Sequence, residues 1–394
     1  MKQIIKSGSF LTLMFMLLGC LSLYAADNDL ITKQITINLE KAGTLPDRIA
    51  SSKKYKITNL KIIGEINGTD LSMIREMAGS NNTDGKLSVL DLSEAKIVKG
   101  GDCYYNDNYN NNYYTSNDVI GDCAFYDCSG LTSLTLPAGI TSIGISAFAY
   151  CSGLTSLNLP AGITSINYGA FLDCSGLTSL TLPDGITSIG SRAFYGCSGL
   201  TSLTLPAGIT SIGGGAFKDC SGLTSLTLPA GITSIGDDTF YGCSGLTSLT
   251  LPAGITSIGE YAFSGCSGLT SLNLPAGITK IGWNAFSGCS GLTSIYVYAE
   301  KVPKMYSDVF KGCDAKKCTV YVPKGTYDDY WLSEFGYFEN IVEFDATGID
   351  KTTTSTDVEE VSRYSVNGQR LVGPTKGLNI VKYSDGSVKK VAVE

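Results

Sequence analysis

Hydrophobic positions recur along most of this chain with a constant spacing of 23 residues. The unit reads C-S-G-L-T-S-L-T-L-P-A-G-I-T-S-I-G-x-x-A-F-x-x, and its leucines follow an L-x-x-L-x-L spacing, as at Leu131, Leu134 and Leu136. This spacing predicts a short strand with one apolar face and a bend at its start. Pro137 has no N–H to donate and therefore ends the strand, and Gly139 permits a turn before a second short extended segment.

Two isoleucines, an Ala-Phe pair and one cysteine complete the apolar set of each unit. In the first full unit, Ile140 and Ile143 point inward from the second segment, and Ala147-Phe148 returns the chain. The recurring aromatic side chain is expected to fill the interior and the cysteine to close the coil. The phenylalanines are Phe148, Phe171, Phe194, Phe217, Phe240, Phe263 and Phe286, and the cysteines are Cys128, Cys151, Cys174, Cys197, Cys220, Cys243, Cys266 and Cys289.

One such coil cannot bury both of its faces, but stacking would place identical side chains over one another at about 5 Å, the spacing of neighbouring strands. The sequence therefore predicts a solenoid, a β-dominated, curved, right-handed coil of 23-residue repeats that extends over residues 85–345.

An N-terminal cap is expected over residues 27–84, because the stack needs a covered end. The pattern predicts a strand from Ile31 to Leu39, an atypical coil from Ile57 to Ile66, and a helix from Asp70 to Ala78 with Asp70 as its N-cap. This helix would turn three apolar side chains inward, those of Leu71, Ile74 and Met77.

The first repeat coil is interrupted. Leu87 to Leu92 begins a coil in repeat register and Ile120 to Phe125 closes it, but the step from Leu87 to Leu131 is 44 residues, which implies 21 inserted residues, assigned to 99–118. After Ser294 the repeat decays. A last strand is predicted from Cys318 to Pro323, a helical cap from Tyr327 to Phe335 and a closing strand from Ile341 to Phe344.

A linker and a small all-β module follow. Residues 346–359 lack apolar periodicity, which is typical of a linker. Residues 360–394 contain alternating segments joined by Asn367-Gly368 and Asp385-Gly386 and predict two hairpins.

Residues 1–26 predict a secretory signal peptide, with Lys2 and Lys6 before a short apolar run and Ala25-Ala26 at its end. Leu17 to Cys20 also resembles a bacterial lipobox, in which Cys20 would be lipidated. Cleavage after Ala25 or Ala26 and lipidation of Cys20 both remain open. Either route places the protein outside the cytoplasm, and no transmembrane span is expected in the mature chain.

The repeats resemble the BspA-like branch of leucine-rich-repeat proteins, which are found on or released from bacterial surfaces. The resemblance covers about Leu87 to Phe344, where L-T-S-L-T-L-P and I-T-S-I-G-x-x-A-F-x-x-C recur with little drift. It implies a leucine-rich-repeat solenoid of the α/β class. It also implies attachment to host matrix proteins, other bacteria or epithelial cells, and it brings no catalytic residues.

Composition narrows the possible functions. The chain has no histidine, which excludes His-based catalytic triads and His-ligated zinc sites. Twenty-nine Lys and Arg against 36 Asp and Glu give a net charge of −7, which argues against nucleic acid as a partner. No cofactor is expected.

The cysteine row suggests a metal or disulfide framework, but stacked parallel side chains do not supply converging ligands or disulfide geometry. We interpret these cysteines as small buried hydrophobes. Pairing of Cys103 with Cys123, and of Cys313 with Cys318, remains open.

The outward residues of the first strand of each coil are candidate binding residues, because solenoids commonly bind on their concave surface. Their hydroxyls and amides suit a glycan or a polypeptide edge, although threonine also simply favours strands. The candidates are Thr132, Ser133, Thr135, Thr155, Ser156, Asn158, Thr178, Ser179 and Thr181.

The insertion supplies a second candidate surface, since tyrosine and asparagine provide contact area and hydrogen bonds without charge. A tolerated polar loop is the alternative. The candidates are Tyr104, Tyr105, Tyr109, Tyr113 and Tyr114.

Acidic pairs are the remaining candidates for catalysis, as at Asp237-Asp238 and Asp328-Asp329, but adjacent acids on a solenoid surface are more often solvated. The sequence therefore favours a non-enzymatic binding or adhesion protein, at the bacterial surface or secreted, with host surface proteins or glycans as partners. A structural spacer and a glycan-capture accessory are the alternatives.

Overall fold

The computed structural model describes residues 30–107, 109–346, 360–365, 370–374, 376–383 and 388–393. The proposed signal peptide, Cys20, the linker from residue 347 and the two Gly-containing turns of the last module lie outside the described residues. The chain divides into two compact units, Met1–Ile163 with Cys174–Leu180, and Thr164–Asp173 with Thr181–Glu394.

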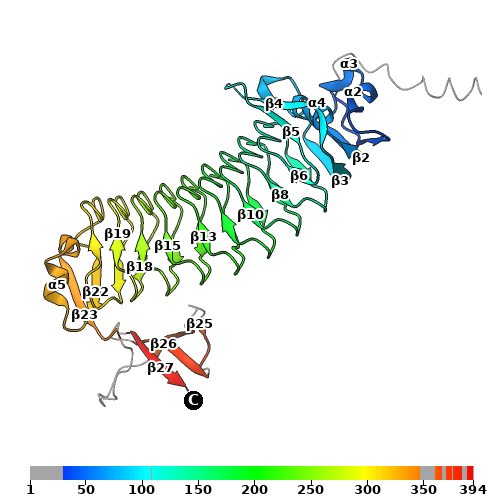
Figure 1. The fold of residues 1–394 in the computed structure, drawn as a ribbon. Helices are drawn as coiled ribbons and strands as arrows, with labels where there is room; N and C mark the ends of the chain where they lie inside the picture. The colour runs from blue at the N-terminus through cyan, green and yellow to red at the C-terminus, as the bar shows by residue number, and fades with distance from the viewer. Residues whose placement is uncertain are drawn as a thin grey trace, which may run out of the picture. The chain divides into compact units, whose positions relative to one another are not determined.

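The first unit contains a parallel sheet that runs from the cap into the repeats, in the order β1-β2-β3-β7-β9-β11. Figure 1 labels β2 and β3 of this sheet. Leu90 on β3 lies beside Leu134 on β7, so the interrupted coil shares the register of the repeats, as predicted. A second row pairs β6 with β8. The strands are β1 (Ile35–Leu39), β2 (Asn59–Ile66), β3 (Val89–Ile97), β6 (Val119–Ile120), β7 (Ser133–Thr135), β8 (Ser142–Ile143), β9 (Ser156–Asn158) and β11 (Ser179–Thr181).

The helices of the first unit belong to the cap: α2 (Leu45–Arg48), α3 (Ser51–Lys54), α4 (Gly68–Met77) and the 3-10 turn η1 (Ser80–Asn82). Leu71, Ile74 and Met77 of α4 are buried, as predicted.

The predicted N-cap of α4 is wrong. Asn67 is the N-cap, and its side chain accepts a hydrogen bond from the Thr69 N–H at 3.0 Å. Asp70 stands one turn later, fully buried, and its carboxylate accepts from the N–H groups of Asn67, Gly43 and Leu45. It completes a capping box and also fixes the loop before α2.

The second unit also contains two rows of parallel strands, one from the first strand and one from the second strand of each coil. Ser225, Leu226 and Thr227 pair one to one with Ser248, Leu249 and Thr250, a shift of one whole repeat. The strands are β10 (Ser165–Ile166), β12 (Ser188–Ile189), β13 (Ser211–Ile212), β14 (Ser225–Thr227), β15 (Ser234–Ile235), β16 (Ser248–Thr250), β17 (Ser257–Ile258), β18 (Ser271–Leu274), β19 (Lys280–Ile281), β20 (Ser294–Val297), β21 (Lys304–Met305), β22 (Thr319–Pro323) and β23 (Asn340–Phe344).

The core of every repeat coil is the apolar set that the pattern predicts. The Phe217 ring lies between those of Phe194 and Phe240, with centroids 5.4 and 5.5 Å away and interplanar angles of 9° and 2°. All three rings are fully buried. Stacked aromatic pairs of this kind add roughly 0.5–1.5 kcal/mol beyond the area that they bury.

We call the segment between the second strand and the cysteine of each coil its outer turn. In the coil that contains β8, the outer turn is residues 144–150. A third row of backbone hydrogen bonds joins the outer turns of neighbouring coils. The N–H groups of Cys123, Phe125 and Asp127 donate to the carbonyls of Ile145, Ala147 and Ala149 at 2.7–2.9 Å. Each coil is therefore bonded to the next on this side as well as through its strands.

The outer turn requires a left-handed residue in every coil. One position has φ between 51° and 64° throughout and is glycine in two coils only. Its occupants are Cys123, Ser146, Gly169, Arg192, Gly215, Asp238, Tyr261, Asn284 and Asp308.

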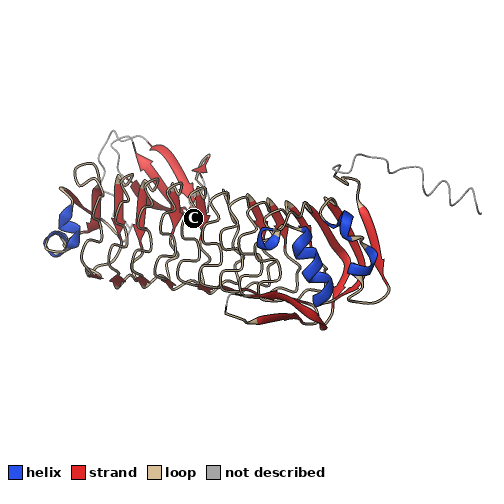
Figure 2. Cartoon of the chain, turned by 90° about the horizontal axis from the view of Figure 1, so that it is seen from above, coloured by secondary structure: helices blue, strands red, loops and turns tan. Residues whose placement is uncertain are grey.

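The C-terminal end is closed as predicted, except that the helical cap is broken into α5 (Tyr327–Trp331) and the 3-10 turn η2 (Glu334–Tyr337). Phe335 and Phe338 pack against Phe310 at 5.1 Å and end the row of phenylalanines. In the described part of the chain, helices occur only near the two caps (Figure 2).

A small antiparallel sheet forms the last part of the chain, in the order β25-β24-β26-β27. The all-β module is therefore present as predicted. Its strands are β24 (Glu360–Ser365), β25 (Arg370–Leu371), β26 (Gly377–Tyr383) and β27 (Val388–Val393).

Candidate binding surfaces

The outward residues of β7, β9 and β11 are exposed, but their threonine hydroxyls are partly engaged. The hydroxyls of Thr132, Thr155 and Thr178 donate to the backbone carbonyls of Ser88, Thr132 and Thr155 at 3.0–3.2 Å. These threonines therefore add a side-chain bond between coils, a structural role. The other six candidates are also exposed: Ser133, Thr135, Ser156, Asn158, Ser179 and Thr181.

The insertion folds into a β-hairpin of β4 (Gly100–Asn106) and β5 (Asn112–Thr115). Its base is fixed to the first turn of α4. The Thr69 hydroxyl donates to the Asp102 carboxylate at 2.9 Å and accepts from the Asp102 N–H at 3.0 Å. Gly68 makes this approach possible, because a Cβ there would lie 2.0 Å from the Asp102 carbonyl oxygen.

Asp107 orders the hairpin turn. Its carboxylate accepts from the N–H groups of Tyr109 and Asn111, from the Asn111 amide and from the Tyr113 hydroxyl. These bonds, led by the one from the Asn111 side chain, hold the pKa of Asp107 below its usual value. Asp107 therefore ties together the described residues on the two sides of the turn.

The hairpin divides its tyrosines between the surface and the interior. Tyr109 is 87% exposed and Tyr114 is 55% exposed. Tyr105 lies opposite Tyr113, with ring centroids 5.6 Å apart, and also stacks on Tyr126 at 5.4 Å. Tyr126 in turn meets Tyr150 edge to face at 5.3 Å, which extends the aromatic row onto the next outer turn.

Tyr104 points the other way and is only 4% exposed, so it does not belong to a contact surface. Its hydroxyl donates to the Asp122 carbonyl at 2.7 Å. Burial raises the pKa of this phenol far above its usual value, so it remains a donor. The prediction that Tyr104 belongs to the binding surface is therefore corrected, because its side chain is buried.

Arg75 is a buried residue that the sequence analysis missed. It extends from α4, and its Nη1 donates to the carbonyls of Cys123 at 2.6 Å and Ala124 at 3.1 Å. The guanidinium also lies over the Tyr105 ring, 4.6 Å from its centroid. The available signal was a charged residue within the apolar pattern of the helix.

The repeat cysteines are buried thiols without a disulfide bond, and those from Cys151 to Cys289 each form a hydrogen bond that the sequence did not predict. Sγ of Cys220 donates to the carbonyl of Phe194, in the preceding coil, at 3.0 Å, and the same bond recurs along the row. Burial raises the pKa of the thiols of Cys220 and Cys243, which keeps them protonated as donors. Cys103, Cys123, Cys313 and Cys318 are free as well.

Both carboxylates of the acidic pair Asp237-Asp238 are engaged by neighbouring groups. The Asp237 carboxylate accepts from the N–H of Glu260, and Asp238 pairs with Lys218 at 3.3 Å. Asp328 and Asp329 lie in the first turn of α5.

Burial raises the pKa of Cys123 to about 11 despite the nearby Arg75, so this thiol is not activated. Among the described residues no group of three or more Cys, Asp or Glu could hold a metal ion.

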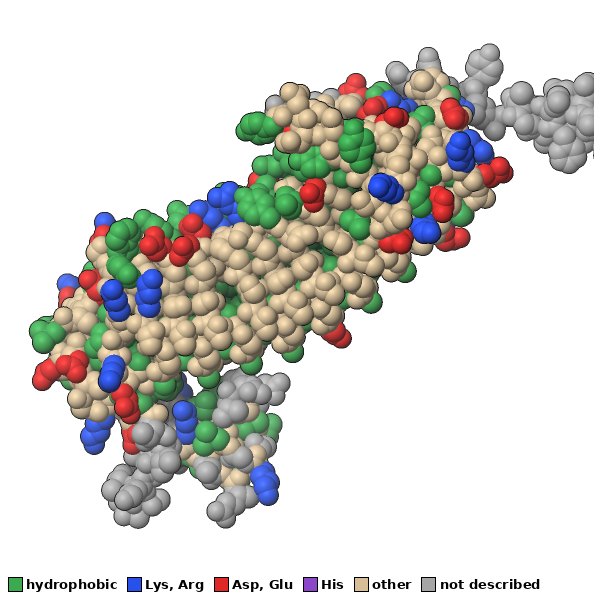
Figure 3. All heavy atoms as spheres, in the orientation of Figure 1, with side chains coloured by type: hydrophobic (Ala, Val, Ile, Leu, Met, Phe, Trp, Pro, Cys, Tyr) green, Lys and Arg blue, Asp and Glu red, His purple; other side chains and the backbone are tan. Residues whose placement is uncertain are grey.

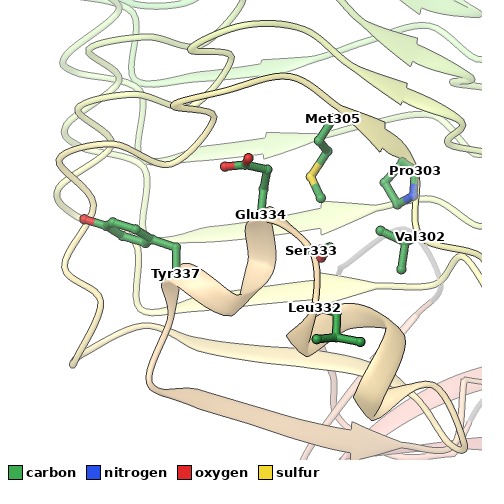
Figure 4. A pocket seen from close by; sticks show the side chains of 7 residues that line it. All are labelled: Val302, Pro303, Met305, Leu332, Ser333, Glu334 and Tyr337. Atoms are coloured by element: carbon green, nitrogen blue, oxygen red, sulfur yellow. The ribbon is translucent and has the colours of Figure 1, made fainter.

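An open pocket of about 520 Å³ lies at the C-terminal cap, between η2 and the loop into β21 (Figure 4). Pro303, Met305 and Leu332 give it apolar walls, with Glu334 and Tyr337 on one side. Leu332 is 84% exposed. The pocket contains one acid and no other charged group, so it does not indicate a reaction.

On the face shown in Figure 3, the repeat coils present mainly backbone and uncharged side chains, with a few charged side chains along one edge. In the described part of the chain, no helix is long and apolar enough to cross a membrane.

Three solved structures of bacterial proteins resemble the chain. A leucine-rich repeat protein of T. pallidum is 35% identical over 38% of this chain and 71% of its own, with a TM-score of 0.37. One from Bacteroides ovatus is 22% identical over 79% and 92%, with a TM-score of 0.39. A leucine-rich cell surface protein of Faecalibacterium prausnitzii is 25% identical over 78% and 82%, with a TM-score of 0.40.

None of the curated proteins matches the chain. The family described as the BspA type leucine rich repeat region matches in six copies, over residues 100–224 and 210–327. These residues make up more than half of the sequence and include the coils whose leucine, isoleucine, phenylalanine and cysteine rows form the core. The chain therefore belongs to the family of proteins with the BspA type leucine rich repeat region.

Proposed function

We propose that this protein is an exported surface protein that binds macromolecules of a host or of other bacteria, and that it acts without catalysis. The observation that carries the proposal is the ordered hairpin β4–β5. Asp107 fixes its turn, α4 fixes its base, and the result presents Tyr109 and Tyr114 to solvent.

Binding is favoured over a spacer role because large exposed aromatic side chains on a fixed support are typical of contact surfaces. Tyrosine supplies area and a hydrogen bond at low entropic cost. The hairpin also interrupts an otherwise uniform repeat, and the exposure of Tyr109 and Tyr114 is not needed for the hydrogen bond that Tyr104 donates to the first coil. Family membership agrees with a surface role, and residues 1–26 favour export.

The strand surface of β7, β9 and β11 is the weaker candidate for the same function. The hydroxyls of Thr132, Thr155 and Thr178 already bond the neighbouring coil, and the residues of this surface differ little from coil to coil. We therefore place the principal site at the hairpin, and host matrix or cell-surface proteins are the proposed partners.

The test is saturable binding of the chain without residues 1–26 to immobilised fibronectin, fibrinogen, mucin and a polysaccharide panel. The variant Tyr109→Ser/Tyr114→Ser keeps the hairpin, since neither side chain is buried. The control, Tyr168→Ser/Tyr261→Ser, removes two tyrosines that are 43% and 39% exposed on repeat coils.

We expect the hairpin variant to lose binding to a matrix protein by roughly tenfold or more, and the control to retain it. Binding of the unmodified chain to polysaccharides alone would move the function to glycan capture. No binding to any surface, even with the protein displayed in many copies on beads, would contradict the proposal and favour a spacer.

A further inference from the structure

Two lysines occupy adjacent positions that are serine in the six coils before them. The second strands of those six coils begin with Ser142, Ser165, Ser188, Ser211, Ser234 and Ser257, but the last two strands of the row, β19 and β21, begin with Lys280 and Lys304. These two residues are direct neighbours in the parallel pairing. Neighbouring strands lie about 4.8 Å apart, so two like charges are held side by side, an arrangement that costs stability.

Both ammonium groups lie near one ring. Nζ of Lys280 is 5.5 Å and Nζ of Lys304 is 5.4 Å from the centroid of Tyr306. Neither lysine is paired with a carboxylate in the described part of the chain, and both are exposed. Asp308, two residues after Tyr306, is paired with Lys311 at 3.8 Å.

Trp283 completes the cluster. Its indole meets Tyr306 edge to face, with centroids 5.8 Å apart, and it is 48% exposed. The cluster therefore combines two unneutralised cations with an accessible aromatic face, on an otherwise acidic protein. Adjacent like charges without a carboxylate partner are an exception to the usual pairing of side chains on neighbouring strands, and such exceptions are expected at functional sites.

We propose that Lys280, Lys304, Tyr306 and Trp283 bind an anionic sugar residue of a polysaccharide. The carboxylate or sulfate of the sugar accepts hydrogen bonds from the two ammonium groups. The apolar C–H face of the ring packs on the indole of Trp283. A sugar fits better than an acidic peptide, because a peptide carboxylate would use the lysines but not the aromatic face. The site belongs to the second unit and does not rest on the function proposed for the hairpin.

Lys218 provides a control for the loss of a lysine that lies beside a tyrosine ring. Its Nζ lies 4.4 Å from the Tyr241 ring centroid, much as the two site lysines lie against Tyr306, but it is neutralised by Asp238 at 3.3 Å. Substituting it changes the net charge without touching the cluster.

The experiment is calorimetric titration of the intact chain with four probes. Chondroitin sulfate oligosaccharides carry sulfate and carboxylate, hyaluronan oligosaccharides carry carboxylate only, dextran oligosaccharides are neutral, and polyglutamate is an anion without sugar. We expect binding of one or both anionic glycans, no binding of dextran, and weaker binding of polyglutamate. Hyaluronan separates a carboxylate ligand from a sulfate ligand.

The variants then test the residues. Lys280→Ser/Lys304→Ser restores the residue that fills this row in six other coils, so the fold is retained, and it should weaken glycan binding roughly tenfold or more. Trp283→Ala should weaken binding of the glycan but not of polyglutamate. Lys218→Ser should change neither.

Three results would overturn the proposal: no saturable binding of either anionic glycan, an equal loss with Lys218→Ser, or binding of polyglutamate as tight as that of the glycan and unaffected by Trp283→Ala. The first would leave the lysines as guards of β21, which ends its sheet, because lysine on an edge strand discourages pairing with another chain.

Discussion

The repeat coils and the N-terminal cap provide hydrogen-bond donors to equivalent backbone carbonyls in two different ways. In the coils, the carbonyls of Ile145 and Ala147 accept hydrogen bonds from the N–H groups of the preceding outer turn. The equivalent carbonyls of the first coil are those of Asp122 and Ala124, and no repeat coil precedes them. The Tyr104 hydroxyl and the Arg75 guanidinium donate to them instead.

This difference shows what repetition cannot supply. A stack of identical coils provides partners for every interior coil, but the first coil needs donors from a different structure. Arg75 and Tyr104 come from a helix and from the hairpin, 49 and 18 residues away from their acceptors. The hairpin therefore has a structural use as well as its proposed binding role, and deleting it would also remove a cap.

Alkaline pH should destabilise the repeat coils more than the N-terminal cap, and this is the largest effect that we expect. The coils contain buried thiols, whereas residues 30–102 contain no cysteine. Burial raises the pKa of Cys128 from its ordinary 9.0 to about 12, and the pKa values of Cys220, Cys243 and Cys266 are raised as well. The folded thiols keep their protons while the unfolded chain loses them. Their contribution to stability is thus complete below pH 9 and is lost between pH 9 and 12.

We expect each buried thiol to lower the free energy of unfolding by roughly 1 kcal/mol at pH 10 relative to pH 7. Urea titrations of the reduced protein at several pH values measure this loss. The variant Cys220→Ala/Cys243→Ala should lose less stability on raising the pH. A free energy of unfolding that stays constant up to pH 10 would contradict the assignment.

A mid-stack phenylalanine should produce the largest effect of a single substitution. Phe217→Ala removes a fully buried ring that stacks on both neighbours, and we expect a loss of about 3–5 kcal/mol in the free energy of unfolding. Phe217→Leu, which leaves a smaller void, should cost about 1–2 kcal/mol. Chemical denaturation gives both values, and a loss below 1 kcal/mol for alanine would show that the coils do not depend on this row.

Arg75→Met tests the cap side of the comparison. It keeps the apolar stem but removes the donor to the carbonyls of Cys123 and Ala124, and we expect a loss of about 2–3 kcal/mol. Amide hydrogen exchange should become faster in residues 120–128 before it does in later coils. Arg192→Met, at an exposed arginine, is the control and should change stability by less than about 0.5 kcal/mol. If Arg75→Met and Arg192→Met lowered the free energy of unfolding equally, the capping role of Arg75 would be contradicted.

The smallest effect concerns the left-handed position of the outer turn. Tyr261→Gly should stabilise the fold by about 0.5–1 kcal/mol, because Tyr261 has φ of 54° and glycine adopts that conformation without strain. Gly215→Ala is the reverse test. A Cβ there meets no atom closer than 3.5 Å, so its expected loss of about 1 kcal/mol would come from the backbone alone. Thermal melts compare the two, and a loss on Tyr261→Gly would contradict the argument.

The residues that the sequence predicted correctly are those whose partners repeat with them. Leu134, Ile143 and Phe148 are buried because each stacks on a copy of itself, so one repeat suffices to predict its neighbours. The cysteine row was predicted as buried for the same reason, although its bonds to phenylalanine carbonyls depend on a shift between coils that the spacing does not reveal.

The errors and omissions lie where partners are distant and unique. Asp70 and Asn67 are both residues that cap helices, and the choice between them depended on N–H groups at Gly43 and Leu45. The composition of the insertion suggested a polar loop, whereas its order comes from contacts of Asp107 and Thr69. Which tyrosine is buried follows from the alternation of β4, a signal hidden by low complexity.

The one-to-one pairing of Ser225 with Ser248, a whole repeat apart, has a genetic consequence. Because equivalent residues meet in every interior coil, an in-frame loss or gain of one repeat leaves the remaining coils with the same neighbours. Unequal recombination between such similar coding segments can therefore change the number of coils without any compensating substitution. The two caps lack this freedom, since Arg75, Tyr104 and Phe335 each have a single set of partners. We expect related genes to differ in repeat number while keeping both ends.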